Sequence, residues 1–145
     1  MKTIALRYGE NLAPEGGTIA AHQEVIDRLG YVWYGKFGSP VSQSVVQEVL
    51  GSEEPRILLI QSGGQRRYWA YIEEIKREAP PLNEIPMYYR NIASKIRCWI
   101  KIIEIREAAN NVVSRCTVVS SGKSLTEASR SSMSPYFIIC YEGER

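Results

Sequence analysis

The side chains of this chain that are best suited to chemistry are aromatic. The stretch 30–40, GYVWYGKFGSP, holds four aromatic residues, two of them Trp33 and Tyr34, beside glycine and lysine. In an extended segment neighbouring side chains point to opposite faces, so Trp33 and Tyr34 face opposite ways. Gly35 follows at once, and glycine lets a backbone approach a ligand closely. The indole of Trp33 can therefore offer its face to a flat guest, or it can fill the end of a barrel.

A second aromatic group, Tyr88 and Tyr89 followed by Arg90, lies in the segment 77–95, which is long for a connection in a small domain. Such a segment can place rings opposite Trp33 and complete a slot for a planar group. Basic residues gather in the middle part of the chain, from residue 36 to residue 101: Lys36, Arg66, Arg67, Arg90, Lys95, Arg97 and Lys101. Cations on phosphates and rings on bases are what single-stranded or flipped-out nucleic acid requires. A solvated basic face is the simpler alternative.

Catalytic and metal-binding patterns are scarce. The sequence has no phosphate-binding glycine loop, nucleophile elbow or zinc-protease motif, and its single histidine, His22, falls in an expected helix. Its three cysteines are 18 and 24 residues apart, which is not zinc-ligand spacing. A small nucleotide-processing or RNA-processing enzyme would have to use Lys101 and Glu104. These residues do not form a nucleophile and a base at a known spacing. We therefore expect no metal, no cofactor and no catalysis, with a small processing enzyme as the alternative.

The hydrophobic pattern predicts how these residues are positioned. Strands are expected at 2–8, 31–35, 56–62, 68–75, 96–105, 112–121 and 136–142. Helices are expected from Thr18 as N-cap to Gly30, from Ser39 as N-cap to Gly51, and over 124–132. A hairpin turn is expected at Gly63. This order predicts an α+β fold with a small, mixed, strongly curved sheet or barrel and two to three helices packed outside.

Size and composition agree with one globular domain over residues 1–145. The chain is 44% hydrophobic and 23% charged, near the averages of globular proteins. A net charge of +2 permits a polyanionic partner without requiring one. No apolar run approaches the 18 residues of a membrane span, and no signal peptide is recognisable, so a cytoplasmic location is expected.

The order of these motifs resembles the EVE and YTH domains of the PUA-like superfamily. The match runs through YVWYGKFGSP, VSQSVVQEVL, RILLIQSGGQ, RYWAYIEEI, the aromatic segment with IPMYYRN, and IRCWIKIIEI. It covers roughly residues 30–105, and a looser match continues through SSGKSLTEASRSS. The resemblance implies a PUA-like fold that binds DNA or RNA by accepting a modified base, such as a methylated adenine or cytosine, in an aromatic cage. Such a module would guide a partner nuclease or modifying enzyme.

The resemblance also implies roles for individual residues. Trp33 corresponds to the first cage tryptophan, and the peptide groups of Tyr34 and Gly35 would address the base edge, with Ser62 as a further polar contact. The second wall, often tryptophan in the family, would be Tyr88 and Tyr89. The implied phosphate contacts are Lys36, Arg66, Arg67 and Arg90, whereas Trp69 would serve packing. The alternative to nucleic-acid binding is a protein interaction module that uses the same aromatic and arginine side chains as an interface.

Overall fold

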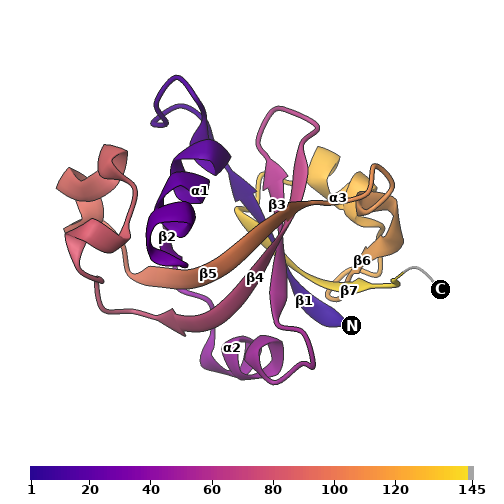
Figure 1. Ribbon diagram of the computed structural model, residues 1–145. Helices are drawn as coiled ribbons and strands as arrows, with labels where there is room; N and C mark the ends of the chain where they lie inside the picture. The colour runs from indigo at the N-terminus through magenta and orange to yellow at the C-terminus, as the bar shows by residue number, and fades with distance from the viewer. Residues whose placement is uncertain (144–145) are drawn as a thin grey trace.

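The computed structural model describes residues 1–143 as one sheet with helices on both sides (Figure 1). The strands are β1 (Lys2–Tyr8), β2 (Val32–Lys36), β3 (Arg56–Gln61), β4 (Arg67–Lys76), β5 (Cys98–Glu107), β6 (Cys116–Val118) and β7 (Tyr136–Tyr141). The α-helices are α1 (Thr18–Leu29), α2 (Gln43–Leu50) and α3 (Leu125–Ser131), and three 3-10 helices are η1 (Leu82–Glu84), η2 (Met87–Lys95) and η3 (Val113–Arg115).

The seven strands follow the order β2-β5-β4-β3-β1-β7-β6. β1 and β3 pair in parallel and the other neighbours are antiparallel, so the sheet is mixed. Register shifts in the β4–β5 ladder lie near Ile72, where irregular pairing increases local twist. The expected α+β class and mixed sheet are confirmed. The expected barrel is not confirmed, because in the described residues the ladder ends at β2 and β6 without closing.

The sheet buries three apolar clusters. The largest lies between the sheet and helices α1 and α2, which contribute Val25 and Val46 among others. The second lies on the opposite face under α3, with Leu125 and Trp69 as members, so Trp69 packs in the core. The third lies beneath η1 and η2, at the left end of the view in Figure 1. Both faces of the sheet are therefore covered.

Local sequence signals place most elements but miss some boundaries. The N-cap of α1 is Gly17 rather than Thr18, whose backbone N–H instead donates to Glu10 Oε1 at 2.9 Å. Helix α2 begins at Gln43 rather than at Pro40. The expected strand 112–121 is reduced to β6, because its first residues form η3. The segment 77–95 is not an irregular loop, since most of it forms η1 and η2.

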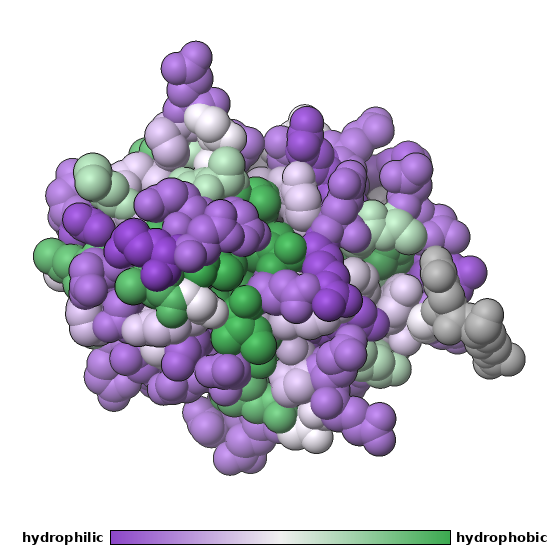
Figure 2. All heavy atoms as spheres, viewed as in Figure 1, coloured by the Kyte–Doolittle hydropathy of each residue, from purple (hydrophilic) through white to green (hydrophobic). Residues whose placement is uncertain are grey.

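The surface shown in Figure 2 is mostly hydrophilic, with hydrophobic residues in a narrow band down the middle of this face. Large apolar side chains that stay exposed include Phe37 (48%), Leu12 (53%) and Met87 (76%). In residues 1–143, none of the helices has both the length and the apolar character needed to cross a bilayer.

Candidate functional site

A cavity of about 290 Å³ opens between strands β1 and β2, and we call it the aromatic cavity. Its walls come from Leu6–Gly9 at the end of β1, Tyr34–Phe37 at the end of β2, Thr18 at the start of α1, and Tyr88 and Tyr89 on η2. The cavity exists because of the sheet order. Among residues 1–143, β1 pairs with β3 and β7, and β2 pairs only with β5, so no ladder joins β1 to β2 there. The gap between them leaves space for a guest.

The floor of the aromatic cavity is a buried hydrogen-bond chain. His22 Nδ1 lies 2.8 Å from the carbonyl oxygen of Thr18, and His22 Nε2 lies 2.7 Å from the hydroxyl of Tyr89. A carbonyl can only accept, so Nδ1 carries the proton and Nε2 accepts from the Tyr89 hydroxyl. The Tyr89 oxygen in turn accepts from the Gly35 N–H at 3.1 Å. Complete burial lowers the pKa of His22 to about 4, which keeps the imidazole neutral near pH 7.

This chain fixes η2 to the free edge of β2. The Tyr89 hydroxyl meets the Gly35 N–H and lies 3.2 Å from the carbonyl oxygen of Trp33, two edge groups that a further strand would otherwise pair. Tyr88 packs edge-on against Tyr89, with ring centroids 4.7 Å apart and an interplanar angle of 78°. The wall formed by η2 is thereby positioned before any guest arrives.

The side walls combine aromatic faces with phenol hydroxyls. Tyr8 and Tyr34 are almost fully buried, and their hydroxyls have no hydrogen-bond partner among residues 1–143. Burial raises the pKa of Tyr34 above its ordinary value and raises that of Tyr88 to about 12, so these phenols stay protonated at neutral pH. A protonated phenol can both donate and accept. Phe37 and Leu12 form an apolar, exposed mouth.

Lys36 adds a buried positive charge beside the aromatic cavity. The residue is 3% exposed, and Nζ donates to the carbonyl oxygens of Phe37 at 3.2 Å and Ser39 at 2.6 Å. It also lies 4.8 Å from the ring centroid of Tyr136 on β7. Desolvation lowers the pKa of Lys36, and within residues 1–143 no carboxylate lies in ion-pair range of its ammonium. The ammonium bridges the gap between β2 and β7 and is not a surface charge.

Trp33 does not take the place expected for it. The indole is 3% exposed, packs with Ile85 and Trp99 in the cluster beneath η1 and η2, and does not line the aromatic cavity. Its Nε1 donates to Glu84 Oε1 at 3.2 Å, and Lys76 Nζ lies 4.4 Å above the ring. The reason is the strand alternation: Tyr34 faces the seam between β1 and β2, so its neighbour Trp33 faces the side that residues 77–95 cover. Trp33 is therefore not placed to stack on a guest in the aromatic cavity.

Gly35 is needed for packing. A Cβ at this position would lie 2.8 Å from Cδ1 of Ile96 and 3.1 Å from Cζ3 of Trp99. Because the Gly35 N–H already donates to the Tyr89 hydroxyl, this N–H is not available to bind the edge of a base. The predicted backbone contact at Gly35 is therefore replaced by an internal hydrogen bond.

The remaining expected site residues lie in several places. Ser62 does not line the aromatic cavity, and its backbone N–H donates to the carbonyl oxygen of Tyr8 at 2.8 Å. Arg66 and Arg67 line a separate hollow near the turn between β3 and β4. Arg90, on η2, lies outside both hollows.

The residues considered for catalysis are engaged elsewhere. Lys101 Nζ lies 3.4 Å from Glu73 Oε2, and Glu104 is paired with Arg106. The two candidates therefore sit in separate ion pairs. In the described part of the chain, no three His, Cys, Asp or Glu side chains gather as metal ligands would.

Five of the ten expected site residues line the aromatic cavity: Tyr34, Gly35, Lys36, Tyr88 and Tyr89. The expectation missed Tyr8 and Thr18. A signal for Tyr8 was present, since it ends the first strand directly before Gly9, where a glycine often marks a strand end that borders a ligand. Thr18 could not be recognised, because its place depends on how α1 packs.

Comparison with known proteins agrees with this architecture. Searches of curated proteins and of solved structures returned no match. A scan against family models matches residues 4–134 to the PUA-like family. This match spans most of the chain and includes β2 and most of β1, the two strands that flank the aromatic cavity, whereas β7 lies beyond its end. The chain therefore belongs to the PUA-like family.

Proposed function

We propose that this chain is a non-catalytic nucleic-acid-binding domain that accepts a single base, preferentially a modified one, in the aromatic cavity. Membership of the PUA-like family suggests nucleic-acid binding, including RNA binding, in general. The observation that carries the finer proposal is a preformed, phenol-lined cavity open at the seam between β1 and β2. Binding of this kind would serve to guide a partner nuclease or modifying enzyme.

The size of the aromatic cavity suits one heterocycle. Its volume of 290 Å³ lies at the lower end of ligand pockets, which span about 300–1,000 Å³. A base reaches such a cavity only when it is unstacked, as in single strands or in flipped-out nucleotides. Single-stranded nucleic acid is therefore the expected partner.

Each part of the aromatic cavity has a task in this proposal. Tyr88 and Phe37 offer ring surface, and stacking of one base contributes about 1–3 kcal/mol. The unpaired hydroxyls of Tyr8 and Tyr34 can hydrogen-bond the edge of the base. The ammonium of Lys36 is buried beside the aromatic cavity. It would therefore interact with a hydrogen-bond acceptor on the bound base rather than with a phosphate outside the cavity. Arg66, Arg67 and Arg90 remain the proposed outer contacts to phosphates.

The apolar mouth supports a preference for methylated bases. Leu12 and Phe37 border the entrance, so a methyl group on a bound base can lose contact with water there. One buried methyl contributes about 0.8 kcal/mol, which is about a fourfold gain in affinity. The preference should therefore be measurable and modest.

Binding of labelled single-stranded DNA and RNA tests the proposal. Matched oligonucleotides carrying methylated or plain adenine or cytosine are titrated with wild type and with the variants Phe37→Ala and Tyr88→Ala. Met87→Ala is the control, because Met87 precedes Tyr88 on η2 but is 76% exposed and outside the cavity. We expect each cavity variant to lose about 1–3 kcal/mol of binding and the control none.

Two results of these titrations would contradict the proposal. If cavity variants and control bind every oligonucleotide alike, or if wild type shows no preference between methylated and plain bases, the aromatic cavity does not read a base. A pull-down partner that survives nuclease treatment would then identify the domain as a protein interaction module.

A further inference from the structure

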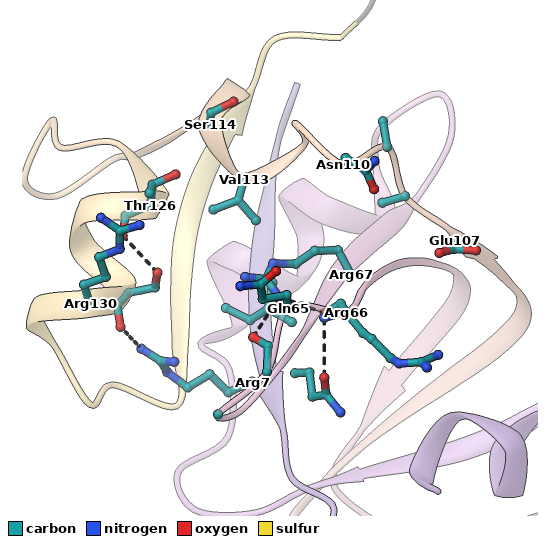
Figure 3. Close-up of a pocket in the computed structure, with 17 residues that line it drawn as sticks. Arg7, Gln65, Arg66, Arg67, Glu107, Asn110, Val113, Ser114, Thr126 and Arg130 are labelled. Atoms are coloured by element: carbon teal, nitrogen blue, oxygen red, sulfur yellow. Dashed lines mark hydrogen bonds between the residues drawn. The ribbon is translucent and has the colours of Figure 1, made fainter. Parts of the chain in front are cut away.

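A second large cavity lies away from the aromatic cavity and is lined by arginine. This hollow of about 760 Å³, which we call the arginine hollow, lies between the turn that joins β3 to β4, the start of the segment after β5, and α3 (Figure 3). Arg7, Arg66, Arg67 and Arg130 all line it, and Glu107 is its single carboxylate. Polar side chains such as Asn110 and Thr126 complete its rim.

The arginines of this hollow are not neutralised by the protein. Among residues 1–143, ion pairs involve Arg28, Arg56 and Arg106, but none of the four arginines that line the arginine hollow. Four guanidinium groups in one concavity repel one another, and a bound anion would offset that repulsion. The arrangement therefore has the charge of an anion site.

Free donors point to the same conclusion. The Arg7 side chain uses Nε on the carbonyl oxygen of Ser134 and Nη2 on those of Ser129 and Ser132, which leaves both N–H groups of Nη1 without a partner among the described residues. The Nε of Arg67 is buried and likewise has no partner there. The side chain of Arg130, on the last turn of α3, makes no hydrogen bond or ion pair within residues 1–143. Figure 3 shows Arg7 and Arg130 on the α3 side and Arg67 between them and Arg66.

We propose that the arginine hollow binds a phosphate group of a nucleic-acid strand, through Arg7, Arg67 and Arg130. Guanidinium forks match phosphate oxygens in pairs of hydrogen bonds, which makes arginine the residue of choice for such a site. Arg7, which also lines the aromatic cavity, links the two sites across the end of β1. The inference extends the proposed function, and its test does not depend on base recognition.

Binding of an abasic oligonucleotide isolates the phosphate contribution. The variants Arg130→Gln and Arg67→Gln are compared with Arg28→Gln, which makes the same charge change on an exposed site at the far end of α1. Each hollow variant should weaken binding about tenfold and reduce the slope of log K against log salt by about 0.7, whereas the control should not. Thermal unfolding confirms that each variant is folded.

Removal of the single carboxylate gives the converse test. Glu107→Gln takes a negative charge from the rim of the arginine hollow and should strengthen binding of the abasic oligonucleotide about threefold. A purely structural role of this cluster would not produce a gain. Equal binding by wild type, Arg130→Gln, Arg67→Gln and Glu107→Gln would overturn the proposal, whatever the base-binding variants do.

The source of the phosphate is settled by the same titrations. Oligonucleotides with a 5′-phosphate or a 5′-hydroxyl are compared, because a terminal phosphate carries about −1.5 to −2 charges and an internal diester carries one. A preference for the phosphorylated end that disappears in Arg130→Gln assigns the arginine hollow to strand ends. An equal loss on both oligonucleotides assigns it to the internal backbone.

Discussion

The hydroxyl of Tyr89 should stabilise the wall of the aromatic cavity, and Tyr89→Phe tests this directly. The substitution removes one oxygen and keeps the ring, so packing changes little. It leaves the Gly35 N–H and His22 Nε2 without their partner in a buried site. A buried polar group that loses its hydrogen bond costs about 1–3 kcal/mol. Two such groups, with some relaxation, give an expected loss of about 3 kcal/mol in the free energy of unfolding.

The size of the effect makes it easy to measure. Unfolding entropy of about 2.1 cal/mol/K per residue amounts to about 0.3 kcal/mol/K for 145 residues. A loss of about 3 kcal/mol therefore lowers Tm by about 10 °C. Urea unfolding followed by tryptophan fluorescence should give the same loss with an unchanged m value. Tyr88→Phe is the control, because the Tyr88 hydroxyl is not part of the hydrogen-bond chain that joins Thr18, His22, Tyr89 and Gly35. The Tm of this variant should fall by only a few degrees.

A double variant shows whether the hydrogen bonds of His22 and Tyr89 are energetically coupled. His22→Leu combined with Tyr89→Phe removes donor and acceptor together, so the double variant should be less destabilised than the two single losses added, by about 0.5–3 kcal/mol. If Tyr89→Phe unfolds at the wild-type temperature, or if the two losses simply add, the hydrogen-bond chain does not hold η2 against β2.

Three further predictions follow from buried residues. The pKa of His22 is about 4 in the folded protein against 6.5 in the unfolded chain, so between these pH values the unfolded state binds more protons. The stability that neutral His22 contributes is therefore complete above pH 6.5 and is lost as pH falls toward 4. In urea titrations over this pH range, wild type should lose about 3 kcal/mol of unfolding free energy relative to His22→Gln. Gly35→Ala should cost about 1–3 kcal/mol by overpacking against Ile96, and Ile96→Val should restore part of this Tm loss. Trp33→Phe should lower Tm and leave the oligonucleotide affinity of the folded protein unchanged, because its indole lies outside the aromatic cavity; a loss of affinity without a loss of Tm would contradict that placement.

The elements of the fold could be predicted because their signals are local. The alternation of KTIALRY and the apolar run RILLIQ define β1 and β3 closely, and Gly30 ends α1 in the left-handed conformation that glycine favours. The segment 77–95 was harder, because its 3-10 turns depend on contacts with β2 and β5 rather than on periodicity. Barrel closure was also beyond a local pattern, since it depends on whether β1 and β2 meet.

The site was predicted in part, for a reason that lies in β2. Alternation correctly separates Trp33 from Tyr34, but it cannot say which face receives η1 and η2. That choice decides which of the two buried rings borders the aromatic cavity and which packs beneath η1 and η2. The arginine side chains illustrate the same limit: Arg66 and Arg67 stand out in the turn sequence, whereas Arg7 and Arg130 join them only through the pairing of β1 with β3 and the position of α3.

The two proposed sites are held at a fixed spacing by one strand. Consecutive residues at the end of β1 serve different faces of the sheet: Tyr8 belongs to the cluster that borders the aromatic cavity, and the Arg7 side chain reaches the arginine hollow and lies 5.6 Å from the ring of Phe137 on the other face. β1 pairs with β7 up to Leu6 and with β3 up to Tyr8, so its end is held by the β3 ladder and the strand leading to it by the β7 ladder. A strand of nucleic acid that placed a base in one site and a phosphate in the other would therefore pass over the end of β1. Its conformation would be selected by a rigid part of the protein, which reduces the ordering cost of binding.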